Sequence, residues 1–144
     1  MLLIPLIISS FLSLFAQPPM TPNVEIMVTN IRNNKGQIAI GIYKDQHSFD
    51  KEQSLVNKKF EKKAMQKGIL LIKFDIEPGT YGFTLLDDEN ANSKMEYNFF
   101  GLPTEGFGFS NYYHTGFTRP KFESFKLEVK QNELNKSTIK VRYL

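Results

Sequence analysis

The chain has no cysteine and no tryptophan among its 144 residues. Without cysteine it cannot form a disulfide bond, a thiolate metal site, a cysteine nucleophile or a lipid anchor on an N-terminal cysteine. It also lacks a glycine-rich phosphate-binding loop that opens a helix. Its aromatic residues are 13 phenylalanines and 6 tyrosines. A chain of this length can bury one core without disulfides, so we expect a single domain.

No apolar run reaches the roughly 18 residues typical of a membrane-spanning helix. The longest run, residues 2–15, is followed by Ala16 and by a polar, proline-bearing segment. This order predicts a signal peptide over residues 1–16 and a secreted or periplasmic mature domain over residues 17–144, with no stable membrane span after cleavage. An uncleaved anchor is the alternative, because no Lys or Arg precedes the run and Leu14 is bulky for its place before the cleavage site.

Positive charge exceeds negative charge only slightly. There are 18 Lys and Arg side chains against 15 Asp and Glu, which gives a net charge of +3. So weak an excess does not favour nucleic acid as a partner. Five lysines gather in one segment around Glu61: Lys58, Lys59, Lys62, Lys63 and Lys67. We expect them to form a solvated face or to protect an edge strand from pairing with another chain.

Alternation of apolar and polar residues is the main secondary-structure signal. It predicts strands over residues 24–30, 37–43, 69–74, 81–86, 124–129 and 138–143, and favours a further edge strand within residues 56–66. Residues 45–54 are expected to loop or to form one helical turn. About seven short strands without a long helix predict an all-β fold, an antiparallel two-sheet sandwich with Greek-key character.

An oxygen-rich loop follows the central strand. Side-chain oxygens recur at Asp88, Asn90, Asn92 and Glu96, and the Lys94 carbonyl lies between them. This spacing allows a tight loop to direct successive oxygens at one calcium ion, which would be the only cofactor. The alternative is a surface loop in which the Asp and Asn side chains cap their own backbone.

An aromatic and glycine-rich segment comes next. Its candidate ligand-binding residues are Glu105, Phe107, Phe109, Ser110, Tyr112 and Tyr113. The ring faces suit an envelope glycan or the apolar patch of another surface protein. Equally, the segment can be a connection that folds over one end of the sandwich and closes the core with its rings.

Catalytic motifs are weak. Ser110, His114 and Glu105 are near in sequence and form a conceivable hydrolytic group, although no spacing of a known nucleophile motif supports it. We therefore expect a non-catalytic binding module or envelope accessory domain, with a small hydrolase as the alternative.

Three segments resemble a family of secreted bacterial proteins, domain of unknown function 2141: VTNIRNNKGQIAIGIY, IEPGTYGFTLLDDENAN and NFFGLPTEGFGFSN. The similarity covers residues 24–144. It implies export and an immunoglobulin-like or transthyretin-like β-sandwich, and no activity. Ser93 stands where the family's loop usually has glycine, and Glu96 where Asp is more typical. These departures imply a weaker metal site here than in relatives.

Overall fold

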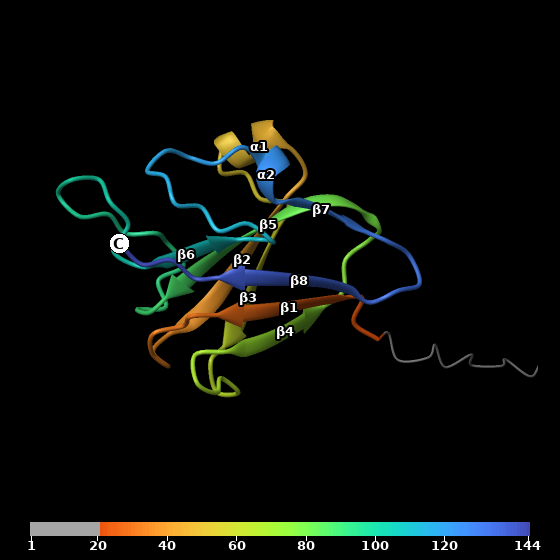
Figure 1. Cartoon of the computed structure of the whole chain (residues 1–144), viewed down its shortest axis with the longest axis horizontal. Helices are drawn as coiled ribbons and strands as arrows, with labels where there is room; N and C mark the ends of the chain where they lie inside the picture. The colour runs from red at the N-terminus through yellow and green to blue at the C-terminus, as the bar shows by residue number, and fades with distance from the viewer. Residues whose placement is uncertain (1–20) are drawn as a thin grey trace, which may run out of the picture.

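The computed structural model describes residues 21–144, so the predicted signal peptide lies outside the described residues. The chain forms two β-sheets that pack face to face (Figure 1). In chain order the elements are β1 (Val24–Thr29), β2 (Gln37–Tyr43), α1 (Gln46–Asp50), β3 (Val56–Glu61), β4 (Leu70–Phe74), β5 (Gly79–Asp88), β6 (Gly106–Phe109), α2 (Phe122–Phe125), β7 (Lys126–Val129) and β8 (Asn135–Lys140). Within residues 21–144, neither helix has the length and apolar character needed to cross a membrane.

The smaller sheet has the strand order β4-β1-β8, and the larger has β3-β2-β5-β6, with β7 also paired to β5. All pairs are antiparallel except β1 with β8, which run parallel. The predicted two-sheet sandwich is confirmed, with eight strands rather than about seven. The parallel pair was not predicted, because alternation within a strand carries no information about the direction of its neighbour.

Branched side chains from the two sheets fill the space between them. Val24, Ile26 and Val28 of β1 are fully buried, and alternate residues of β2, from Ile38 to Ile42, are buried against them. Period-two burial is what a strand with one covered face requires. Phe83 of β5 packs edge to face on Phe74 of β4, with ring centroids 5.7 Å apart, and so joins the two sheets through the core.

Strand β6 was not predicted, since glycine normally disfavours strands. Its two glycines face β8. A Cβ at Gly108 would lie 2.5 Å from Ile139 Cγ2, and one at Gly106 would lie 2.5 Å from Val141 Cγ1. Glycine is therefore needed here because the strand lies against its neighbour in the other sheet at close approach. Beyond β8, Arg142 exchanges two backbone hydrogen bonds with Phe107, of 2.8 and 3.0 Å.

The outer face of the larger sheet is partly covered by the two short helices. Helix α1 begins at a capping box in which the Asp45 side chain accepts from Ser48 N and the Ser48 side chain binds Asp45 N. Together the helices contribute most of a second apolar cluster, made of Phe49, Phe109, Phe122 and Phe125. The predicted helical turn within residues 45–54 thus has a packing role, and the predicted strand 124–129 begins only at residue 126, after α2.

Strand β3 lies at the edge of its sheet and carries exposed Lys59, with exposed Lys63 and Lys67 following it, as expected for a protected edge. Lys62 is different. It was expected on the solvated face, but its side chain turns inward and pairs with Asp87 of β5. Charge patterning alone missed this pairing, because the partner is distant in the sequence.

Candidate functional site

A groove lies on the part of the larger sheet's outer face that the helices leave open. Its floor consists of residues from three strands whose side chains point away from the core: Ala39, Gly41, Tyr43, Thr84, Leu86 and Phe107. The floor is low in the middle, because Ala39 and Gly41 of β2 have little or no side chain. The larger rings of Tyr43 and Phe107 also line the groove.

Two long loops form the walls of the groove. One covers residues 93–103 and the other residues 114–120, and in Figure 1 they project beside β6 as teal and blue arms. The groove is open to solvent, and its space of about 700 Å³ lies within the usual range for a site that holds a small ligand or part of a chain. Tyr97 and Phe117 line the walls and are 59% and 79% exposed. Such exposed rings beside a cavity are free to contact a ligand.

Polar side chains line the groove together with the rings. Arg119 pairs with Glu52 at 2.9 Å, and its guanidinium lies over the Phe49 ring, 4.6 Å from the centroid. His114 Nε2 lies 2.5 Å from the Thr118 carbonyl, so this nitrogen carries the hydrogen and donates it. These contacts hold the second wall in position. The groove therefore combines flat apolar faces with fixed donors and acceptors.

The predicted aromatic segment divides between groove and core. Phe107 and Phe109 line the groove, and Phe109 is also part of the second apolar cluster. Tyr112 packs against that cluster, and Tyr113 is exposed beneath the ammonium of Lys140, which lies 4.8 Å from its ring centroid. The segment therefore contributes both to the lining of a groove and to an apolar cluster that closes one end of the sandwich.

Ser110 is fully buried. Its hydroxyl donates to the Phe125 carbonyl at 2.6 Å and accepts from Phe83 N at 3.0 Å. His114 contacts Tyr112 and Thr118, and Glu105 binds the Glu89 amide. Within residues 21–144 no hydrogen bond joins the serine, the histidine and the glutamate, and each of them has a structural partner instead.

The oxygen-rich loop is organised around Asp88, which lies on the outer side of β5 and is fully buried. One carboxylate oxygen accepts from Asn92 N at 3.0 Å, and the other accepts from Ser93 N at 2.9 Å and Gln37 Nε2 at 2.7 Å. Further along, Asn90 Oδ1 accepts from Asn92 N and Asn92 Oδ1 accepts from Lys94 N. Ser93 has a positive φ of 65°.

These contacts bring part of the predicted metal set together. Asp88 and the two asparagines line successive turns of one loop, and Asn92 Nδ2 donates to Glu96 Oε1 at 2.9 Å. Each of these side-chain oxygens accepts hydrogen bonds from its own loop, as in the capped turn that was the alternative to an ion. Residues 21–144 contain no group of three or more His, Cys, Asp or Glu side chains that is arranged to hold a metal ion.

Glu105, which the sequence placed in the aromatic segment as a candidate binding residue and as a possible further ligand to an ion, lies next to this loop. Its Oε1 accepts from Glu89 N at 3.0 Å, while Oε2 is buried and has no hydrogen-bond partner among residues 21–144. Burial raises the pKa of Glu105, and the negative charges of Asp88 and Glu96 raise it further. A buried carboxylate oxygen without a partner is costly, so this atom marks a position where a cation or a proton would be favourable.

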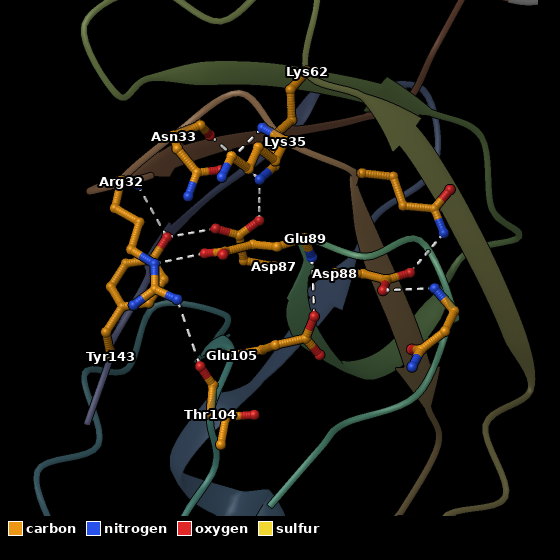
Figure 2. Close-up of polar contacts among 12 residues, drawn as sticks. Arg32, Asn33, Lys35, Lys62, Asp87, Asp88, Glu89, Thr104, Glu105 and Tyr143 are labelled. Carbon is orange, nitrogen blue, oxygen red and sulfur yellow. Dashed lines mark hydrogen bonds and ion pairs between the residues drawn. The ribbon is translucent and has the colours of Figure 1, made fainter.

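A buried polar network connects the loop to Tyr143 near the C-terminus (Figure 2). Asp87 pairs with Lys62 through one oxygen and accepts from the Tyr143 hydroxyl through the other, at 2.5 Å. The Tyr143 ring lies under the Arg32 guanidinium, and Arg32 Nε pairs with Glu89 Oε1 at 2.5 Å. Hydrogen bonding to Arg32 lowers the pKa of Glu89. Burial and the bond to Asp87 raise the pKa of Tyr143, so its hydroxyl stays protonated.

Sequence reasoning missed most groove residues. Tyr43, Thr84 and Phe117 belong to segments that are far apart in the chain, and only the strand pairing β2-β5-β6 brings them together. One signal in the sequence could have indicated the groove: the small residues Ala39, Gly41 and Thr84 at outward positions of two neighbouring strands. Small residues on the exposed side of central strands leave space for something to approach the sheet.

The chain matches a known protein family. The family described as an uncharacterized protein conserved in bacteria (DUF2141) matches residues 26–137, which include most of both sheets. No curated protein and no solved structure matches the chain. Since the family match spans most of the chain, this protein belongs to the DUF2141 family.

Proposed function

We propose that the domain is a non-catalytic binding module and that the groove over β2, β5 and β6 holds a segment of a saccharide chain. The observation that carries the proposal is the groove itself: about 700 Å³ of space with a low sheet floor and exposed rings at its walls. A sugar presents an apolar face of C–H groups to a ring and hydroxyl groups at its rim. The exposed rings of the groove can stack on the C–H face, and its polar groups can bind the hydroxyl groups.

The setting of this activity is the cell envelope. The apolar N-terminal run of residues 2–15, typical of a signal peptide, supports a secreted or periplasmic location, where wall and surface glycans are available. Hydrolysis by Ser110, His114 and Glu105 is disfavoured, because the Ser110 hydroxyl is buried and bound to two backbone groups. Another surface protein is the alternative occupant of the groove.

Isothermal titration of the purified protein with N-acetylglucosamine oligomers tests this proposal. Phe117→Ala removes an exposed wall ring and should weaken binding at least several-fold without lowering thermal stability, because the ring is 79% exposed. Phe99→Ala is the matched control, since Phe99 is 97% exposed but does not line the groove. Equal loss in both variants, or no heat with any oligomer, would contradict a saccharide site.

A second proposal concerns the loop from Asp88 to Glu96, which we propose binds calcium weakly and so stiffens one wall of the groove. It is supported by the buried Oε2 of Glu105 next to the loop, which has no hydrogen-bond partner in the part of the chain that the structure describes. The oxygens of Asn90 and Asn92 each accept one backbone hydrogen bond. Such an oxygen has a second acceptor position free for an ion. The Lys94 carbonyl and the Glu96 carboxylate would complete the set.

Thermal unfolding in millimolar calcium tests the second proposal. Calcium should raise the melting temperature of the wild type, because a ligand that binds only the folded state stabilises it. Magnesium, which requires a smaller octahedral site, should have less effect. Asn90→Ala should abolish the calcium effect while leaving the saccharide titration measurable. An unchanged melting temperature in calcium would refute the ion without touching the groove.

A further inference from the structure

Lys62 and Asp87 form an amine and carboxylate pair that is closed off from solvent. The Lys62 side chain is 1% exposed and the Asp87 side chain is fully buried, with Lys62 Nζ in direct contact with Asp87 Oδ1. Lys62 follows β3 and Asp87 belongs to β5, with β2 between them in the sheet. The pair therefore bridges across an entire strand at one end of the core (Figure 2).

Each partner is also held by a second group. Lys62 Nζ donates to the Asn33 carbonyl at 3.3 Å, which fixes the direction of the amine. The Tyr143 hydroxyl donates to Asp87 Oδ2 at 2.5 Å and itself accepts from Arg32 N at 3.1 Å. A hydroxyl that donates to one carboxyl oxygen withdraws electrons from the carbon, and stabilises negative charge that develops on that oxygen when a nucleophile attacks.

From this geometry we infer that Lys62 and Asp87 condense into an isopeptide bond inside the folded protein. A proton first passes from the Lys62 ammonium to Asp87 Oδ1, which leaves a neutral amine and a neutral carboxyl group. The amine nitrogen then attacks Asp87 Cγ, and the C–Oδ1 bond breaks as Oδ1 takes a second proton from the nitrogen. The products are one amide and one water, so no oxidant or other reactant is needed.

The fold favours this reaction. It holds the Lys62 nitrogen against the Asp87 carboxyl group in a site closed to solvent, which replaces an encounter in solution by a reaction at very high effective concentration. In the product, the Tyr143 hydroxyl keeps its bond by donating to the amide oxygen. The cross-link would join edge strand β3 to central strand β5 in a way that unfolding cannot undo.

Peptide mass mapping of the purified full-length protein tests whether Lys62 and Asp87 are joined. Its result does not depend on cleavage of the predicted signal peptide, because the peptides measured lie outside residues 1–16. Trypsin should not cut after Lys62, and residues 60–63 should appear joined to residues 74–94 at the sum of their masses minus one water. Lys62→Arg should abolish the joined peptide, whereas Lys63→Arg, at an exposed neighbouring lysine, should keep the cross-link. Tyr143→Phe should slow its appearance in freshly folded protein.

The same experiment also shows directly if the cross-link is absent. If the wild-type protein yields only separate peptides, cut after Lys62, even after days of incubation in the folded state, the pair is an ordinary buried ion pair and the inference is wrong. This result does not depend on whether any variant folds, since the wild-type protein alone supplies it.

Discussion

The hydroxyl of Ser110 donates a 2.6 Å hydrogen bond to the carbonyl of Phe125, and so ties the end of β6 to the start of β7. The same oxygen accepts from Phe83 N. Ser110→Ala would leave a buried amide and a buried carbonyl with fewer partners, and should lower the free energy of unfolding by about 1–3 kcal/mol. Urea unfolding followed by circular dichroism measures this. Ser124→Ala, at an exposed serine, should change it by less than about 0.5 kcal/mol; equal effects would refute the assigned role.

Gly108 is a site where any side chain must collide. A Cβ there would lie 2.5 Å from Ile139 Cγ2 and 3.1 Å from the Lys140 carbonyl oxygen. Gly108→Ala should therefore separate β6 from β8 and lower the melting temperature, at a cost of about 1–3 kcal/mol. Gly101→Ala is the comparison, because no atom of residues 21–144 lies within 4 Å of a Cβ placed there and only the positive φ of 74° is unfavourable. A smaller loss at Gly108 than at Gly101 would show that the strands do not approach closely.

Ser93 adopts a left-handed conformation, with φ of 65°, that glycine adopts without a steric penalty. Ser93→Gly should remove strain of about 1 kcal/mol or more, partly offset by the greater freedom of glycine in the unfolded chain, for a net gain of up to about 1 kcal/mol. Ser93→Ala keeps the strain and loses only the hydroxyl, so it should not stabilise. Thermal melts of both variants test this, and a stabilising alanine with a destabilising glycine would contradict it.

Glu105 makes the stability depend on pH in a direction opposite to that of a salt-bridged carboxylate. Its pKa in the folded state is raised above the ordinary value of 4.5. At a pH between the ordinary pKa and the raised one, the folded protein therefore binds more protons than the unfolded protein. This group's contribution to stability therefore falls as pH rises through that window. Relative to wild type, Glu105→Gln should become progressively more stable from about pH 4 to pH 7. A stability difference that is flat across this range would contradict the raised pKa.

The sheets could be predicted because their signal is local. Alternation in segments such as 24–30 and 37–43 reflects one buried face, and any packing partner would impose it. Strand β6 could not be predicted, because Gly106 and Gly108 are determined by the approach of β8, which is distant in sequence. The parallel pairing of β8 with β1 could not be predicted either, because these two strands are also distant in sequence.

The candidate site was predicted only in part. The sequence order indicated the loop after β5 and the rings of Phe107 and Phe109, because these are contiguous. The opposite wall, with Phe117, and the floor, with Gly41 and Thr84, depend on strand order. Lys62 was assigned to the surface for the same reason, since its buried partner Asp87 is 25 positions along the chain (from 62 to 87).

The groove is tested most directly by following the backbone amide signals of isotope-labelled protein during titration with N-acetylglucosamine oligomers. We predict that the amides of Gly41, Thr84 and Phe107 on the groove floor, and of Phe117 on its wall, shift together with one dissociation constant. Amides of Met27 and Leu71, on the opposite sheet, should not move. Shifts confined to the opposite sheet, or no shifts at any concentration, would contradict the proposed site.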